Sequence, residues 1–227
     1  MFDEDRPEYN GELAFYQDIR PHIKTIFDVG SRDSSLFMDF EGEVHYFDPR
    51  SDFIDSLEKQ PCRNTRSYFN RFGLGLENTK NYYYPRFESF YDRIESCYTT
   101  DVENRIELEI RRGDEYMQKN QIETIDFLKI DTEGHEFSVL AGFDDYLSKI
   151  KIIQFEYGGV WIDSHTKLTD AIGVLRAYGF DQFSYLAPEG SHLVPIPENV
   201  VDDYRFCNIV CMNSAFDSIG PFDQARI

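Results

Sequence analysis

The chain has 227 residues, of which 41% are hydrophobic and 16% aromatic, so it has enough apolar material for a core and a globally disordered protein is excluded. Its 42 acidic against 23 basic residues give a formal net charge of -19, which disfavours nucleic acid as a partner. A membrane-spanning helix needs about 18 consecutive apolar residues, and no run in the sequence approaches that length. The first residues do not resemble a targeting segment either. We therefore expect a cytoplasmic protein without a membrane partner.

The predicted elements alternate between short apolar runs and segments with helical spacing, which is typical of βαβ units on a parallel sheet. We expect a helix over 12–20, a strand over 25–29, a short helix over 35–40, a strand over 44–47, a helix over 51–57 and a third strand over 66–72. After a break, strands follow over 125–130 and 151–155, helices over 137–147 and 168–178, and closing strands over 180–186 and 206–212. The sequence therefore predicts a doubly wound α/β fold.

The stretch 76–121 breaks this rhythm, because it is rich in aromatic and charged residues and alternates in polarity only over 105–110. We interpret it as an insertion with a hairpin or edge strands in a single domain spanning 1–227. The connection 187–203 is long, which favours a functional lid. Cys207 and Cys211 share one face of the last strand, and we expect buried thiols there rather than metal ligands.

Acidic residues follow the first two predicted strands, where open parallel sheets bind their ligands. Asp28 lies just before Gly30, and Asp48 follows the next strand 20 residues after Asp28, the interval at which an acidic residue binds a ribose. The alternative is that Asp28 is a turn residue and Asp48 a helix cap. The dinucleotide motif G-x-G-x-x-G is absent after the first strand, so an adenosyl ligand without a pyrophosphate fits better.

The run I-D-F-L-K-I-D-T-E-G-H-E-F-S-V-L-A-G over 125–142 resembles the defining motif of FkbM-type methyltransferases. The resemblance extends to F-D-V-G over 27–30, F-D-P over 47–49, F-G-L-G over 72–75 and I-I-Q-F-E over 152–156, and covers most of 25–156. It implies an S-adenosylmethionine-dependent methyltransferase of class I type. Such an enzyme has a Rossmann-like, seven-stranded, mostly parallel sheet whose last strand is antiparallel.

The resemblance also implies a set of cofactor-binding residues. Asp28, Gly30 and Ser31 would line the amino-acid part of S-adenosylmethionine, Asp48 would hold the ribose, and residues near Gly73 would border the adenine. We also include Arg32, Ser34 and Pro49 in this set. Ser34 stands where the family usually has glycine, and we expect a shifted loop there with serine as a tolerable helix cap.

Methyl transfer to a hydroxyl needs in-line positioning and removal of one proton. We predict His135 as the general base, because its ordinary pKa suits neutral pH, with Glu156 as the next candidate. Asp131 is expected to orient the methionine ammonium or the substrate. We predict no metal, although Asp131 and Glu156, with Asp163 or His165, form an alternative set of ligands for a divalent cation.

A second alternative for this segment is purely structural: Thr132 caps a helix, Glu133 and Glu136 interact with its dipole, and His135 is simply exposed. For the acceptor, the family's breadth implies O-methylation of a small molecule or a sugar. The aromatic residues of 82–84, Trp161 and the loop with His192 would stack on such an acceptor or pack an accessory core. A catalytically idle binding module of the same fold is the alternative function.

Overall fold

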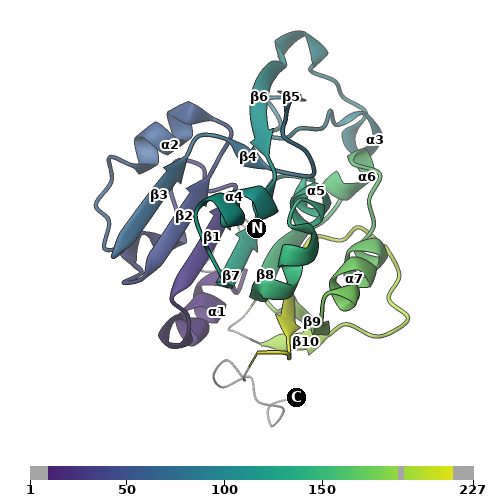
Figure 1. The fold of residues 1–227 in the computed structure, drawn as a ribbon. Helices are drawn as coiled ribbons and strands as arrows, with labels where there is room; N and C mark the ends of the chain where they lie inside the picture. Colours follow the sequence, from purple (N-terminus) through teal and green to yellow (C-terminus); the bar gives the residue numbers. More distant parts are fainter. Residues whose placement is uncertain (1–9, 189–191, 217–227) are drawn as a thin grey trace.

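The computed structural model describes residues 10–188 and 192–216, and its centre is a mostly parallel β-sheet (Figure 1). The sheet has eight strands in the order β10-β9-β11-β8-β7-β1-β2-β3. Their bounds are β1 Thr25–Val29, β2 Glu43–Phe47, β3 Arg66–Asn70, β7 Ile125–Ile130, β8 Ile150–Tyr157, β9 Phe180–Leu186, β10 Leu193–Pro195 and β11 Cys207–Asn213. Among these eight strands, β10 and β11 run in the direction opposite to the other six, so the pairs β10–β9, β9–β11 and β11–β8 are antiparallel.

The eighth strand, β10, corrects the expected number of seven. It lies inside the connection 187–203, which we predicted as a lid, and it pairs with β9 through Leu193 opposite Leu186. Three residues are too few to show an alternating pattern, and Val194 in its middle is 51% exposed. Residues 189–191 of the predicted lid and the first nine residues of the chain lie outside the described part.

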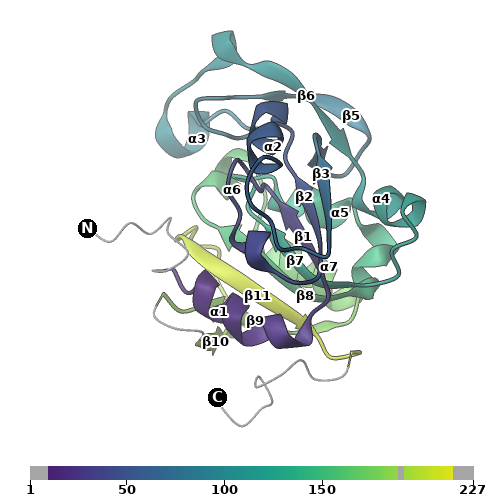
Figure 2. The same ribbon diagram turned by 90° about the vertical axis from the view of Figure 1, so that its left-hand side faces the viewer.

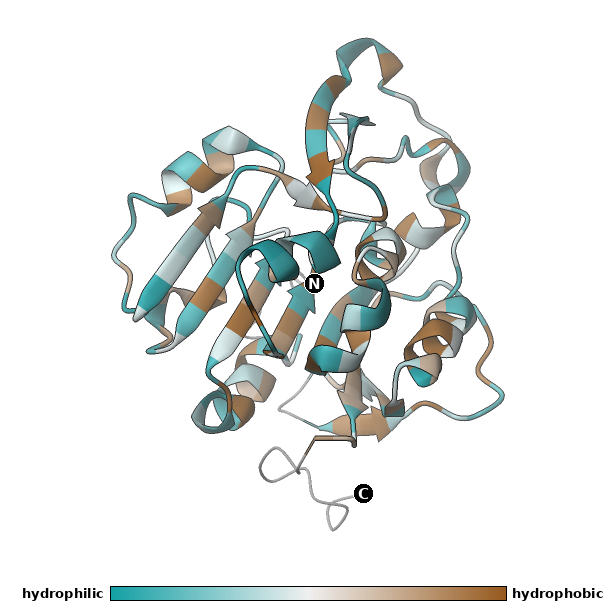
Figure 3. Cartoon of the chain, viewed as in Figure 1, coloured by the Kyte–Doolittle hydropathy of each residue, from teal (hydrophilic) through white to brown (hydrophobic). Residues whose placement is uncertain are grey.

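Helices cover both faces of the main sheet, as Figures 1 and 2 show. The helix α1 (Glu12–Ile19) covers one face, where its Phe15 and Ile19 pack with Val44 and Phe127 in a buried cluster. The helices α4 (Gly113–Lys119), α5 (Glu136–Ala141) and α7 (Leu168–Ala177) belong to the opposite face, where a larger cluster includes Leu128. Strands that are buried on both faces read as apolar runs. In Figure 3, hydrophobic residues (brown) lie on strands of the main sheet and on helices that cover it.

Several predicted helices differ from the observed ones. The expected helix over 35–40 is a 3-10 helix, Leu36–Asp39, and the expected helix over 137–147 is divided into α5 and a 3-10 helix, Asp144–Lys149. Gly142 follows the last residue of α5, and a side chain there would meet the carbonyl oxygen of Gly75. The remaining helices are α2 Ser51–Leu57, α3 Ile94–Cys97, α6 Val160–Asp163, and the 3-10 helices Arg20–His22 and Val102–Asn104.

A second sheet of three strands lies beside the main one, in the segment where we expected a hairpin or edge strands. Its order is β4-β6-β5, and β5 (Thr79–Tyr83) pairs antiparallel with β6 (Ile106–Arg111). The expected third strand over 66–72 ends at Asn70, and the next residues form β4 (Gly73–Leu74), which joins the small sheet instead. No helix in the described ranges combines the length and the apolarity needed to cross a bilayer.

Candidate functional site

One cavity of about 510 Å³ opens where β1, β2, β7 and β8 end, and we call it the strand-end cavity. All the residues that the sequence predicted for the site line it: Asp28, Gly30, Ser31, Arg32, Ser34, Asp48, Pro49, Gly73, Asp131, His135 and Glu156. Because the carboxyl ends of parallel strands meet at one edge of a sheet, residues far apart in sequence are brought together here. Its volume lies in the range of small-molecule sites.

Gly30 allows the ends of β1 and β7 to approach each other. Its φ of +85° is in the left-handed region, and a Cβ placed on it would lie 1.7 Å from the backbone oxygen of Asp131. The Gly30 amide also donates a hydrogen bond to the carbonyl of Phe47, at 2.8 Å. The packing of these two strand ends therefore requires a glycine at this position.

Asp28 is almost fully buried at the end of β1, with 2% of its surface exposed. Burial raises the pKa of its carboxyl group to about 6, although the nearby Lys129 opposes the rise. The hydroxyl of Ser35 donates a hydrogen bond to Asp28 at 2.6 Å, and the Ser35 hydroxyl oxygen accepts one from the amide of Phe37. Ser35, rather than the predicted Ser34, is thus the cap of the short helix after β1.

Asp48 follows β2 and is held by two backbone amides. Its two oxygens accept hydrogen bonds from the amides of Arg50 at 2.8 Å and Arg32 at 3.1 Å. Burial nevertheless raises the pKa of Asp48 to about 7. The guanidinium of Arg32 turns outward and pairs with Glu88 at 2.7 Å, on the rim of the cavity.

The strand-end cavity is strongly acidic: among the described residues, eight acidic and two basic side chains line it. One of the bases is Lys129, whose ammonium nitrogen lies 3.0 Å from Asp131 Oδ2 and 3.9 Å from Glu12 Oε1. Burial lowers the pKa of Lys129, but the neighbouring carboxylates, led by Asp131, outweigh it and raise the pKa overall. Lys129 is therefore charged at neutral pH. Lys129 is part of the motif over 125–142 but had no predicted role, and Glu12 was not among the predicted site residues.

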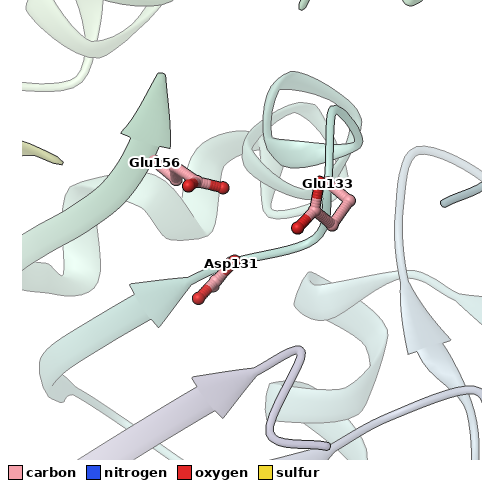
Figure 4. A group of neighbouring side chains, drawn as sticks. All are labelled: Asp131, Glu133 and Glu156. Atoms are coloured by element: carbon pink, nitrogen blue, oxygen red, sulfur yellow. The ribbon is translucent and has the colours of Figure 1, made fainter. Parts of the chain in front are cut away.

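Three carboxylates gather at the ends of β7 and β8 (Figure 4): oxygens of Asp131, Glu133 and Glu156 lie within 4.8 Å of one another. Burial is the main cause that raises the pKa of Glu133 and, far more, that of Glu156. Asp131 already pairs with Lys129, and Glu133 pairs with Arg93 at 2.7 Å. Only Glu156 has no ion-pair partner among the described residues.

The wider set of metal ligands that the sequence left open is not assembled. The Asp163 carboxylate accepts hydrogen bonds from the amides of Glu95 and Ser96, at 2.9 and 3.1 Å, where it holds the start of α3. His165 is exposed and pairs with Glu95 at 3.6 Å. Neither residue lines the strand-end cavity. Asp163 and His165 are therefore excluded as partners of Asp131 and Glu156.

His135 lines the cavity and is only 4% exposed, so the alternative of an exposed histidine is wrong. Neither ring nitrogen has a hydrogen-bond partner among the described residues. The ring lies 4.9 Å from that of Phe90 and 5.8 Å from that of Tyr91, between centroids. Burial lowers the pKa of His135 to about 4, so the imidazole is neutral at physiological pH and can hydrogen-bond a ligand.

The loop between β7 and α5 is braced by Glu136 rather than capped by Thr132. One oxygen of Glu136 accepts hydrogen bonds from the amide and hydroxyl of Thr132 and from the amide of Gly134, at 2.9 to 3.2 Å. Gly134 has a φ of +101°, in the left-handed region. The side chain of Glu136 is fully buried. This brace keeps the residues that follow β7 at the cavity.

Most aromatic residues that we considered for the acceptor have structural roles. Trp161 is fully buried, and its indole N–H donates to the carbonyl of Glu156 at 3.0 Å. Tyr82 stacks under the guanidinium of Arg105, at 3.7 Å. Tyr83 does line the cavity, whereas His192 does not. Further lining residues that the sequence did not indicate include Asn10, Phe90, Phe206 and Asn208.

Comparison with known proteins defines the class. The sequence matches the methyltransferase FkbM domain over residues 28–181, which is more than half of the chain and includes most of the cavity. The protein is an S-adenosylmethionine-dependent methyltransferase. It belongs to the FkbM methyltransferase family, as the motif over 125–142 suggested.

Two further comparisons add little. None of the curated proteins compared with the sequence matches it. Among solved structures, the fold is similar to that of the plantazolicin methyltransferase BpumL in complex with SAH, at 8% sequence identity and a TM-score of 0.48. The alignment covers 93% of this chain and 87% of that one.

Proposed function

We propose that the protein transfers a methyl group from S-adenosylmethionine to a hydroxyl of a small molecule or sugar, bound in the strand-end cavity. The observation that carries this proposal is the convergence of Asp28, Asp48, Asp131 and Glu156, from four neighbouring strands, on one cavity. The order of the strands suits a Rossmann-like sheet of class I type, with β10 added at its edge.

The chemistry of the lining fits the cofactor part by part. Carboxylates such as Asp28 and Asp131 suit an ammonium, and the acidic surroundings suit a sulfonium. Asp48 keeps free lone pairs beyond its two backbone bonds, so it can accept hydrogen bonds from ribose hydroxyls. Gly73 and Pro49, beside Phe90, provide an apolar wall for the adenine of the cofactor.

The cofactor supplies a methyl group on a sulfonium, and its transfer to oxygen needs in-line positioning and removal of the hydroxyl proton. Among the predicted residues, Glu156 is the stronger base, because burial and the nearby Asp131 raise its pKa whereas that of His135 falls to about 4. We therefore assign proton removal to Glu156. The neutral His135, whose ring nitrogens have no partner among the described residues, hydrogen-bonds the acceptor. Asp131 stays paired with Lys129 and holds the amino-acid part.

Calorimetric titration with S-adenosylmethionine, S-adenosylhomocysteine and NAD tests the cofactor. Both adenosyl ligands should bind and NAD should not. Tight binding of NAD without a response to either adenosyl ligand would refute the proposed site.

A panel of alcohols and sugars, assayed by transfer of a labelled methyl group, tests the acceptor. Once a substrate is found, Glu156→Gln should lower the rate by about 10²–10⁴-fold and leave cofactor affinity unchanged. The His135→Ala variant should lose less of the methyl-transfer rate than Glu156→Gln, because His135 only orients the acceptor in this proposal. The reverse order of losses would return the role of base to His135.

A further inference from the structure

The strand-end cavity poses an electrostatic problem for the proposed cofactor. Its amino-acid end carries a carboxylate as well as an ammonium, and the lining holds eight acidic side chains. A carboxylate brought there needs a cation, since like charges at close range repel strongly. In the part of the chain that the structure describes, the basic side chains of the lining are Arg32 and Lys129.

Arg32 is poorly placed for this task. Its side chain is 56% exposed, and its guanidinium pairs with Glu88 at 2.7 Å. Its backbone amide bonds Asp48, the residue proposed to hold the ribose. Arg32 therefore belongs to the rim on the nucleoside side of the cavity.

Lys129 has the properties that a carboxylate requires. It lies on β7 two residues before Asp131, so both side chains project from the same face of the strand. Its side chain is 16% exposed, so its charge is weakly screened. An ammonium has three N–H donors, and within the described residues Lys129 uses one, on Asp131. The other two remain for a ligand.

Glu12 holds Lys129 from the opposite side. It comes from the first turn of α1, and its buried carboxylate accepts hydrogen bonds from Gln154 at 2.5 Å and Asn10 at 3.0 Å. Its Oε1 lies 3.9 Å from the Lys129 nitrogen, within ion-pair range but beyond a hydrogen bond. Glu12 thus attracts the ammonium without using one of its donors. It also lies outside residues 28–181, which match the family.

We propose that Lys129 binds the carboxylate of the cofactor's amino-acid part, and that Glu12, from the helix before the family-matched region, positions Lys129 for this contact. The assignment rests on the proposed function, because it presumes an adenosyl cofactor in the strand-end cavity. It makes α1 part of the cofactor site.

Two ligands that differ in the relevant group test the proposal. S-adenosylhomocysteine carries the carboxylate, whereas 5′-methylthioadenosine keeps the adenosine and sulfur but lacks the amino-acid part. We expect Lys129→Met to lower the affinity for S-adenosylhomocysteine by about 10–100-fold, because a charge-assisted hydrogen bond is lost. Binding of the second ligand should stay within about threefold, because it makes no contact with Lys129.

The Glu12→Gln variant keeps the shape of the side chain and removes its charge. The variant should lower the affinity for S-adenosylhomocysteine by about 3–10-fold and leave the affinity for methylthioadenosine unchanged. Lys151→Met is the matched control. It also removes a lysine from an ion pair, the one that Lys151 forms with Asp126 at 2.7 Å, but this pair lies outside the cavity. It should bind both ligands like the wild type.

An equal loss of both ligands in Lys129→Met would show a general structural role and overturn the assignment, as would unchanged binding of S-adenosylhomocysteine. Poor folding of Lys129→Met would move the decision to Glu12→Gln, for which the same two outcomes count against the proposal. If the wild type binds neither ligand, the proposed function itself fails. If the wild type binds both ligands with equal affinity, the adenosyl site stands and the proposed role of Lys129 is refuted.

Discussion

The buried carboxyl group of Asp48 should make the stability of this protein depend on pH in a way that Asp48→Asn removes. Its pKa rises from 3.8 in the unfolded chain to about 7 in the folded one, chiefly through burial. The folded state therefore binds more protons than the unfolded state between these values, and stability is lost as the pH rises from 3.8 to 7. At about 1.36 kcal/mol per pKa unit, the full loss is about 4 kcal/mol.

Between pH 5 and pH 8.5, about 2.7 kcal/mol of this loss is expected in the wild type and none of it in Asp48→Asn. The asparagine has a cost of its own, because its NH₂ faces a backbone N–H of Arg32 or Arg50, but that cost is the same at both pH values. Urea unfolding of both proteins at each pH measures the difference. A gap between the two proteins that changes by less than about 0.5 kcal/mol would refute the reasoning.

Three further variants test features of the core and of the cavity. Gly30→Ala should destabilise the fold by more than about 3 kcal/mol in urea unfolding, because its Cβ would lie 1.7 Å from a backbone oxygen, whereas Gly173→Ala, with nothing within 4 Å, should not destabilise it. His135→Leu should raise the free energy of unfolding by about 1 kcal/mol while methyl transfer falls, since two unpartnered ring nitrogens leave the core; a clear loss of stability would show that the imidazole has a partner. Asp126→Ala should cost about 2–4 kcal/mol in chemical denaturation, because it breaks a partly buried ion pair and two backbone hydrogen bonds; a cost under 1 kcal/mol would contradict this.

The sequence predicted the main sheet and the members of the cavity for the same reason. Buried parallel strands such as β7 and β8 appear as apolar runs, and the polar residue that follows each run must lie at the shared edge. Asp131 and Glu156 could thus be placed together without knowing any contact between them. Neighbouring acidic residues such as Glu133 joined them through the left-handed turn after β7, which no periodic pattern records.

The features that were missed depend on contacts that are distant in sequence or on very short elements. Glu12 meets Gln154 across 142 positions, and α1 showed only a helical spacing. Lys129 is a single polar residue in a buried strand, which is ambiguous until its neighbours are known. The strands β4 and β10 have two and three residues, fewer than a pattern needs. The role of Ser35 depends on a side-chain hydrogen bond to Asp28.

The two residues of β4 belong to both parts of the molecule, since Gly73 and Leu74 line the strand-end cavity and also pair with β6 of the small sheet. The insertion is therefore not a detachable accessory. A chimera that exchanges the segment between β3 and β7 for that of a relative would replace the wall proposed for the adenine together with the outer lobe. Engineers who wish to alter the acceptor alone should join the foreign segment after Gly75 and before Ile110, so that Gly73 and Leu74 keep their partners Ile110 and Arg111.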